Sequence, residues 1–458
     1  MSDAVHEVPA PRRPGLMSLE QALEQLLGAA RPLAGQQSVA TLEADGRVLA
    51  QDIRSALDVP GFDNSSMDGY AANSAEVAAA IAAGRSLPVS QRIPAGHFGP
   101  ALQAGSVARI FTGAPVPAGA DAVQMQEEAE VLADGSVRLL QAPVAGQFIR
   151  RRGEDIRQGE VVLAAGTRLG PAELGLAASL GLAELPVRPR PRVALFSTGD
   201  ELVMPGEVAP EAMAPGAIYN SNRYFLAVLL KRLGCEVSDL GIVPDRREAT
   251  LDALRAAAES HDLIVTSGGV SVGEEDHVKP AVQQLGSLDL WQIAIKPGKP
   301  FAHGWIARSG KATQAGQLAE SGRAGQSGQT GESADRCHFV GLPGNPVSSF
   351  VTFLLLVRPF LLRLQGISAG QGVTPGGADG LPPALALPAH FDWPRADRRR
   401  EFLRVRRNAA GGLDLFPNQS SGVLTSVAWC DGLVDLPAGR TIARGESVNF
   451  ISLAALLG

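Results

Sequence analysis

The stretch that most restricts the fold of this chain is an apolar run followed at once by glycines and acids. Leu263, Ile264 and Val265 stand together and lead into TSGG at 266–269. A short apolar run bounded by turn residues predicts a strand buried on both faces of a parallel sheet. Glycines let the backbone approach a ligand closely, and the acids at 274–276 are hard oxygen ligands for Mg²⁺. The stretch fits either a phosphate-bearing ligand with its metal or an ordinary glycine-rich turn with solvated acids.

The segment around this stretch, residues 189–365, alternates short apolar runs with helical patterns. That alternation predicts a doubly wound α/β domain with a parallel sheet. Four expected strands end in polar sets, which are TGDE at 198–201, PD at 244–245, TSGG at 266–269 and KPGK at 296–299. Ligands of such sheets bind beyond the carboxyl ends of the strands, so four sets at equivalent ends predict a ligand site. No strand leads into a GxGxxG motif or a Walker A loop, which argues against a dinucleotide-binding domain and a P-loop nucleotide-binding domain.

Composition narrows the functional classes. The 458 residues carry a net charge of −6 and give a pI of about 5.7, which argues against a nucleic-acid binder that relies on electrostatics. Three widely spaced cysteines predict neither a disulfide framework nor a zinc site. The N-terminus lacks the apolar core of a signal peptide, and runs such as 353–357 are too short to span a bilayer. We expect a cytoplasmic protein that binds neither nucleic acid nor membrane.

Changes in composition divide the chain into five expected parts. A helix should begin after Ser18, with Gln21 completing a capping box, and a second helical or mixed stretch should cover 44–53. The insertion at 308–335 is rich in Gly, Ser and Gln and should be flexible. The parts are a disordered tail at 1–15, a mixed α/β domain at 16–58 and 150–188, an elongated β-rich domain at 59–149, the α/β domain at 189–365 with its insertion, and a C-terminal β domain at 366–458 that forms a small barrel or sandwich.

Two further motifs have both a functional and a plain interpretation. VPGFDNSSMDGY at 59–70 is either an Asx-rich turn or a loop packed at a ligand site, because it holds apolar residues among turn formers. Arg150, Arg151 and Arg152 form either a solvated face or a phosphate contact, since the Arg fork matches oxyanions.

Seven motifs in a fixed order carry a resemblance to a known family. They are SSMDGYA (65–71), FTGAPVP (111–117), RRRGED (150–155), FSTGDEL (196–202), SGGVSVGEED (267–276), KPGKP (296–300) and GLPGNPVS (341–348). Together they closely resemble the molybdopterin molybdenumtransferases, which are related to the E domain of gephyrin. The resemblance covers residues 16–458 apart from the insertion.

The resemblance implies a reaction and its partners. Adenylylated molybdopterin and molybdate are the implied substrates, molybdenum cofactor and AMP the implied products, and Mg²⁺ or a similar cation the implied metal. It also implies a homodimer, and it names the molybdopterin adenylyltransferase and recipient molybdoenzymes as candidate protein partners. The α/β domain would be the molybdopterin-binding fold.

The resemblance also assigns roles to residues, grouped here by role. Lys296, Lys299 and Arg404, with Ser348 and Ser421 as hydroxyl donors, match the oxyanion site for molybdate. Glu201, Asp245 and Asp276 match the acidic positions, which we assign to the metal and to orienting the attacking oxygen. Thr198, Gly199, Ser267, Gly268, Gly269 and Ser271 should receive the pterin phosphate or its adenylate, and Pro343 and Pro346 should stiffen the GLPGNP loop. Asp68, Thr112 and Arg150 should act from the partner subunit's side of the cleft.

Two other functions stay open, and the chain departs from the family pattern at a few points. An adenylyltransferase would share the α/β domain but not the motifs before residue 188 and after 366. A non-catalytic scaffold would not need the carboxylates and lysines. Gln292 stands where relatives can carry Lys, and Ser66 replaces a more usual Ala. The insertion raises the question of whether it covers the cleft.

Overall fold

The computed structural model describes residues 16–269, 277–308, 335–367 and 381–457. Its contacts divide these residues into two compact units. The first unit holds the described parts of 1–50, 166–174 and 183–458, and the second holds 51–165 and 175–182.

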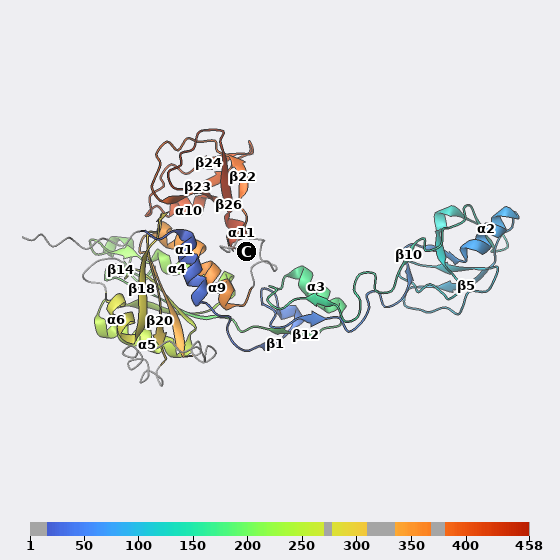
Figure 1. Ribbon diagram of the computed structural model, residues 1–458, viewed down its shortest axis with the longest axis horizontal. Helices are drawn as coiled ribbons and strands as arrows, with labels where there is room; N and C mark the ends of the chain where they lie inside the picture. The colour runs from blue at the N-terminus through green and yellow to red at the C-terminus, as the bar shows by residue number, and fades with distance from the viewer. Residues whose placement is uncertain (1–15, 270–276, 309–334, 368–380, 458) are drawn as a thin grey trace, which may run out of the picture. The chain divides into compact units, whose positions relative to one another are not determined.

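The first unit is built around a six-stranded sheet (Figure 1). The strand order is β16 (Glu236–Val243), β13 (Arg192–Thr198), β17 (Leu263–Ser267), β21 (Arg336–Leu342), β20 (Pro300–Ala307) and β18 (Gly286–Gln292). The first four strands are parallel, and β20 is antiparallel to both of its neighbours. The predicted α/β domain is therefore confirmed, with an antiparallel strand near one edge.

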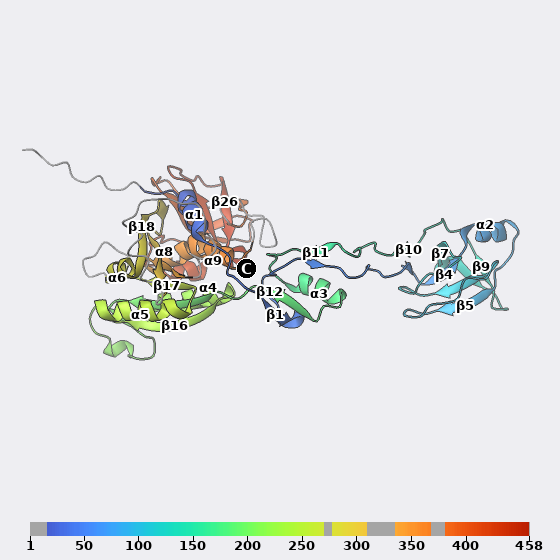
Figure 2. The same ribbon diagram turned by 60° about the horizontal axis from the view of Figure 1, so that its bottom comes forward.

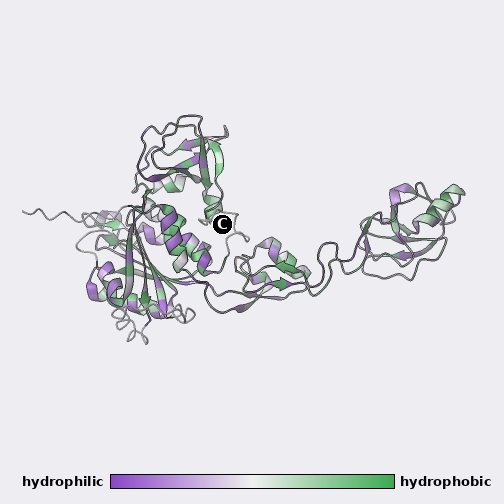
Figure 3. Cartoon of the chain, viewed as in Figure 1, coloured by the Kyte–Doolittle hydropathy of each residue, from purple (hydrophilic) through white to green (hydrophobic). Residues whose placement is uncertain are grey.

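Helices cover both faces of this sheet because its central strands are apolar on both sides. In β13, Val193 and Leu195 belong to one hydrophobic cluster, and Ala194 and Phe196 belong to the other. Figure 3 shows many hydrophobic residues on the sheet, and both hydrophilic and hydrophobic residues on the helices around it. The first cluster lies under α1 (Leu19–Ala29), α4 (Ser221–Arg232), α8 (Pro346–Thr352) and α9 (Arg358–Leu364), and the second lies under α5 (Arg247–Ser260) and α6 (Val278–Leu285).

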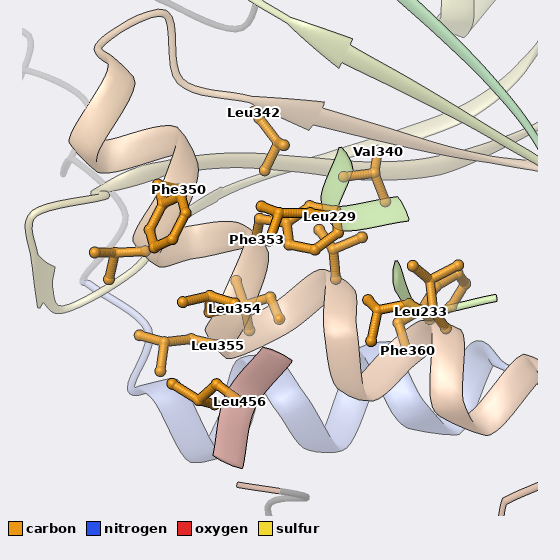
Figure 4. Close-up of a cluster of buried hydrophobic side chains, with 14 of the residues drawn as sticks. Leu229, Leu233, Val340, Leu342, Phe350, Phe353, Leu354, Leu355, Phe360 and Leu456 are labelled. Atoms are coloured by element: carbon orange, nitrogen blue, oxygen red, sulfur yellow. The ribbon is translucent and has the colours of Figure 1, made fainter. Parts of the chain in front are cut away.

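The helical run Pro346–Leu364 is the centre of the first cluster. It joins α8 to α9 through a π-helical turn, Phe353–Val357, whose residues are all buried. Figure 4 shows Phe350, Phe353 and Phe360 of this run packed beside α4 and the sheet. Within the described residues this run alone is long and apolar enough to cross a membrane, but 94% of it is buried inside the protein. Its apolar character is thus that of a core helix.

The strand register brings the predicted polar sets to one edge of the sheet. Ser197 of β13 is level with Ser267 of β17, and Ser267 is level with Leu342 of β21. On the other side, Thr198 is level with Val243 of β16. The link from β18 to β20 carries KPGK and leaves and re-enters the sheet at this edge, where Gln292 pairs with Pro300.

The insertion joins the sheet at the opposite edge. It lies between the end of β20 and the start of β21, where Ala307 pairs with Arg336. The flanking residues are also held together, because Arg308 N donates to Asp335 O at 3.0 Å. Residues 309–334 lie outside the described part of the chain, but both of their attachment points are remote from the strand ends that carry the polar sets.

A second sheet in this unit contains the C-terminal residues. Its order is β19 (Ile295–Lys296), β23 (Arg400–Arg407), β25 (Gly432–Leu436), β26 (Ser447–Ser452) and β22 (Leu385–Pro388), and β24 (Leu413–Leu415) pairs with β23. The short helices α10 (Thr425–Trp429) and α11 (Leu453–Leu457) complete this part. Because β19 is the start of the KPGK segment, the pairing of Lys296 with Glu401 joins the two sheets.

The N-terminal part of the first unit contains the helix predicted after Ser18, and it decides between the helical and mixed alternatives for 44–53. The capping box of Ser18 and Gln21 is present at the start of α1. No α-helix covers 44–53, however. A 3₁₀ turn (Thr41–Glu43) is followed by single backbone pairs, Val48 with Arg168 and Leu49 with Val187. Pairing with residues far along the chain, together with Gly46 at φ +70°, replaces the local helix.

The second unit is β-rich, as expected for 59–149 (Figure 2). Its largest sheet has the order β5 (Val89–Ile93), β6 (Val107–Ile110), β4 (Gly69–Ala72) and β7 (Ala122–Met125), with helix α2 (Ser74–Ala82) beside it. Gly69 is required in β4, because a Cβ there would overlap the carbonyl oxygen of Gln124 on β7. The two-stranded pairs are β8 (Ala129–Val131) with β9 (Val137–Leu139), β10 (Ile149–Arg150) with β3 (Asn64–Ser65), and β11 (Val161–Leu163) with β2 (Ile53–Arg54).

Candidate functional site

The TSGG turn after β17 is tightly packed against the end of β13. Gly268 and Gly269 have φ values of +95° and +66°, in the left-handed region that glycine tolerates. A Cβ on Gly268 would lie 2.9 Å from Thr198 O, and one on Gly269 would lie 2.9 Å from Thr198 Oγ1. Gly268 N donates to Leu342 O at 3.1 Å. The structure therefore brings Thr198, Ser267, Gly268 and Gly269 together at one point of the sheet edge.

A residue that the sequence analysis did not single out connects this turn to the GLPGNP loop. Asn222 lies in the first turn of α4, and its side chain is buried. Its Nδ2 donates to Ser267 Oγ at 2.8 Å and to Gly344 O at 2.7 Å. The only signal in the sequence is the pair Asn220 and Asn222 at the start of a helix, which reads as ordinary capping.

The KPGKP loop packs against the start of α8. Gly298 has a φ of +111°, and a Cβ on it would overlap Thr352 Oγ1 and lie 3.5 Å from Ser348 O. The same end of α8 contacts the C-terminal part, since Val347 N donates to Ser421 O at 3.0 Å. Lys296, Lys299, Ser348 and Ser421, which are far apart in sequence, are thus carried by segments that pack on one another. Pro343 and Pro346 flank the loop, and Pro346 begins α8.

Arg404 belongs to the same group of segments but is held by the protein itself. It lies on β23 and is 1% exposed. Its Nη1 donates to Phe402 O at 3.0 Å and its Nε to Ser426 Oγ at 3.3 Å. Burial lowers the pKa of Arg404 to about 10, so the group is a cation at neutral pH. The side chain is therefore an ordered positive charge beneath the Ser420–Ser421 segment, and Ser420 O accepts from its Nη2 at 3.5 Å.

Lys296 is paired with two carboxylates that the sequence analysis did not assign. Its Nζ lies 2.8 Å from Glu401 and 3.2 Å from Asp397. Burial opposes the charged form, but the hydrogen bonds and charges of Glu401 and Asp397 outweigh it and raise the pKa of Lys296. Arg399 binds Asp397 through Nε, Nη2 and its backbone N–H, which holds the pKa of that carboxyl well below its usual range. An oxyanion at Lys296 would compete with both acids.

Lys299 has different surroundings, because it lines a cavity. The cavity has a volume of about 510 Å³, within the range of small-molecule sites. It is therefore larger than a single tetrahedral oxyanion requires. Three of its lining residues are cations and one is an acid, and the full set is Leu16, Lys299, Ala396, Asp397, Arg398 and Arg399. The cavity suits an anionic ligand of intermediate size.

Two of the three acidic residues predicted to hold the metal lie within the described part of the chain. Glu201 follows β13, where its carboxylate lies beside Gly199, and Asp245 follows β16. The two strands are neighbours, so both acids lie near the same sheet edge. Asp276 and Ser271 lie outside the described residues. In the part of the chain that the structure describes, no three His, Cys, Asp or Glu side chains are placed to hold a metal. Two carboxylates still fit Mg²⁺, which takes one or two of them together with water and phosphate oxygens.

The second unit carries the remaining predicted residues. Asp68 Oδ1 accepts from both the backbone N–H and the hydroxyl of Thr112, each at 2.8 Å. These bonds, the backbone one first, lower the pKa of Asp68. Arg109 lies next to them, because its Nη1 donates to Gly69 O at 2.8 Å and its guanidinium stacks on Phe111. The structure thus brings Asp68 and Thr112 together, and Arg109 holds the neighbouring backbone in place.

The three arginines of RRRGED have different environments. Arg151 pairs with Asp63 at 2.7 Å, and Arg152 pairs with Asp58 at 2.6 Å. Arg150 is exposed on β10, where its backbone is level with Asn64 of β3. The surface interpretation therefore holds for Arg151 and Arg152, and Arg150 alone is available as the predicted anion contact.

Comparisons with known proteins agree with this arrangement. Three family models match in succession: "MoeA N-terminal region (domain I and II)" over residues 17–181, "Probable molybdopterin binding domain" over 194–363 and "MoeA C-terminal region (domain IV)" over 386–453. A molybdopterin molybdenumtransferase of Haemophilus influenzae is 40% identical over 353 residues, which cover 77% of this chain and 78% of that protein. The chain belongs to the molybdopterin molybdenumtransferase family.

Two further similar proteins match nearly the whole chain. A molybdopterin molybdenumtransferase of Synechococcus elongatus is 35% identical over 447 residues, which are 96% of this chain and 100% of that protein. The crystal structure of the molybdopterin biosynthesis moeA protein from Pyrococcus horikoshii is similar with a TM-score of 0.76 and 26% identity, covering 96% of this chain and 100% of that one. The family resemblance and the multidomain α/β fold predicted from the motifs are both confirmed.

Proposed function

We propose that this chain inserts molybdenum from molybdate into adenylylated molybdopterin and releases AMP in a step that depends on a divalent cation. Membership of the molybdenumtransferase family establishes the coarser activity, which is enzymatic transfer of molybdenum to molybdopterin. The observation that supports the finer proposal best is the cationic cavity at Lys299, next to the packed segments that carry Ser348 and Ser421. Its size suits a nucleotide-like or pterin-like anion rather than molybdate alone.

Different groups of residues in this chain would bind the phosphate, the anionic substrate, the molybdate and the metal in the proposed reaction. The glycines of the TSGG turn let the phosphate of the pterin approach closely, and Ser267 offers it a hydroxyl. Lys299 and Arg398 hold anionic substrate in the cavity, because charge-assisted hydrogen bonds are the strong ones. Buried Arg404 adds fixed positive charge where the molybdate dianion would sit between Ser348 and Ser421. Glu201 and Asp245, together with Asp276, would hold Mg²⁺, which when bound would neutralise charge on the phosphates.

A homodimer is part of the proposal. In it, Asp68, Thr112 and Arg150 of one subunit would serve the site of the other, as the family resemblance implies. A mixture of two impaired variants, Asp68→Asn and Lys299→Met, assayed at a molybdate concentration too low to saturate Lys299→Met, should then regain part of the activity by forming mixed dimers. Failure of the mixture to regain any activity, with dimers formed, would contradict the shared site. The adenylyltransferase and recipient molybdoenzymes remain proposed partners on the same ground.

The reaction itself is tested by AMP release. Wild-type chain with Mg²⁺ and adenylylated molybdopterin should release AMP in a manner that depends on molybdate, and the product should activate a cofactor-free molybdoenzyme. One Lys about 4 Å from an anion contributes on the order of 4 kcal/mol before desolvation is subtracted. Lys299→Met should therefore raise the half-saturating molybdate concentration about 10- to 100-fold.

A matched control keeps the Lys299 result specific. Lys231 is an exposed lysine in the last turn of α4, and Lys231→Met removes the same charge away from the cavity. It should leave molybdate dependence unchanged. Tight pterin binding without AMP release by the wild-type chain would overturn the proposal and favour a binding scaffold.

A further inference from the structure

We propose that Asn222 is a positioning residue that orients the Ser267 hydroxyl toward the anionic group of the substrate. Asn222 is 7% exposed, and its single amide nitrogen donates to Ser267 Oγ at 2.8 Å and to Gly344 O at 2.7 Å. One side chain thus connects the first turn of α4, the end of β17 and the loop before α8. The proposal rests on the function proposed above and deepens it at the same site.

The direction of the first hydrogen bond determines what Ser267 can do. A serine hydroxyl has one proton to donate and two lone pairs that accept. The Asn222 amide can only donate through its nitrogen, so Ser267 Oγ accepts in this contact and keeps its own proton. Among the described residues, that hydroxyl donates no hydrogen bond. No described residue therefore uses the Ser267 proton, and a bound anion can accept it.

The surroundings identify the missing acceptor as an anion. Ser267 is followed by Gly268 and Gly269, whose left-handed backbone allows close approach. Ser267 itself ends the parallel strand β17. A hydroxyl donor with no acceptor among the described residues at such a strand end suits a phosphate oxygen of the pterin ligand.

The second hydrogen bond sets the distance between two loops. Gly344 O belongs to the GLPGNP loop, so Asn222 ties this loop to the TSGG turn without contacting the substrate itself. Loss of the Asn222 amide should weaken binding of the substrate more than it slows the chemical step, because an interaction present in both ground and transition states changes KM rather than kcat. A merely structural side chain would lower stability and leave KM unchanged.

The test compares full-length Asn222→Ala with a matched variant. Gln365 is also buried, and its Nε2 donates to a backbone carbonyl, Leu233 O, at the same 2.7 Å. Gln365→Ala should lower the melting temperature to a similar extent and leave KM for adenylylated molybdopterin unchanged. Asn222→Ala should raise that KM about tenfold and change kcat less than twofold. If Asn222→Ala does not fold, the isosteric Asn222→Asp replaces it, and its carboxylate should draw the Ser267 proton away from the substrate and raise KM as well.

A double variant decides whether Asn222 acts through Ser267. Ser267→Ala alone should raise KM about tenfold, and adding Asn222→Ala should raise it by less than a further twofold, because both changes remove the same oriented proton. Effects that simply multiply, or an unchanged KM in folded Asn222→Ala, would overturn the inference.

Calorimetric binding of molybdopterin separates this inference from the proposed reaction. If the wild-type chain binds molybdopterin but releases no AMP, the proposed reaction fails, while the same tenfold change in Kd between wild type and Asn222→Ala would still support the positioning role. A wild-type chain that does not bind molybdopterin would overturn both.

Discussion

Replacing Gly298 by Ala should disable the site without removing any functional group. Gly298 has a φ of +111°, and a non-glycine residue held in such a conformation costs about 1–3 kcal/mol. The added methyl would also overlap Thr352 Oγ1, and forced overpacking costs about 1–3 kcal/mol more. The two costs add to about 2–6 kcal/mol if the loop keeps its position. The KPGKP loop should therefore shift away from α8 and relieve both. Misplacement by about 1 Å lowers rates on the order of a hundredfold.

The assay is molybdate-dependent AMP release, with Gly344→Ala as the matched control. Gly344 lies in the neighbouring GLPGNP loop, but a Cβ there would meet nothing within 4 Å, and its φ is not in the left-handed region. We expect kcat/KM to fall at least tenfold in Gly298→Ala and to stay within twofold of wild type in Gly344→Ala. Equal activity of the two variants would refute the conclusion that the contact between the KPGKP loop and α8 determines the position of the site residues.

Three other predictions concern titration and the insertion. Burial lowers the pKa of His303 to about 3 and of His338 to about 4, so as the pH falls below 6.5 these histidines are protonated in the unfolded chain before they are protonated in the folded one. The free energy of unfolding should therefore fall by about 2 kcal/mol per histidine at pH 5. Hydrogen exchange of β20 and β21 should show this loss in wild type but not after both histidines are changed to Leu. Thr112→Val should raise the pKa of Asp68 toward its ordinary value, so that the acid loses its charge at higher pH than in wild type, whereas Thr112→Ser should not; NMR titration of the carboxyl distinguishes them. Replacing 309–334 with a short Gly-Ser linker should leave melting and AMP release unchanged, because the flanking strands end at the edge opposite the site, and loss of activity would refute that.

The strand-end residues could be predicted from sequence because their environment follows from local pattern. Apolar runs such as Leu263–Val265 need two covered faces, and parallel strands bring their carboxyl ends to one edge. Thr198, Ser267 and Asp245 therefore had to lie near one another once the α/β pattern was recognised. The capping box of Ser18 was predictable for the same reason, since both of its partners lie within one helical turn.

Features that depend on distant segments could not be predicted in this way. Asn222 connects residues 45 and 122 positions away, and the α4 pattern gives no sign of which neighbours it meets. The stretch at 44–53 was expected to be helical or mixed, and its helical alternative was wrong because pairing with residues 168 and 187 decides the backbone there. The partners of Lys296 could not be predicted for the same reason, because Glu401 lies far along the chain on β23 and Asp397 in the segment just before that strand.

The partners Glu401 and Asp397 give Lys296 a different role from Lys299, although the KPGK motif alone does not distinguish the two lysines. Glu401 is 2% exposed, and a buried carboxylate needs a cation, so Lys296 is committed to balancing it. Asp397 is shared between Lys296 and Arg399, which leaves little net charge at Lys296 for a dianion. Lys299 instead faces the cavity, beside Arg398. We therefore propose that Lys296 fixes the junction of the two sheets at Glu401. The attraction for an incoming oxyanion would then come from Lys299 and buried Arg404.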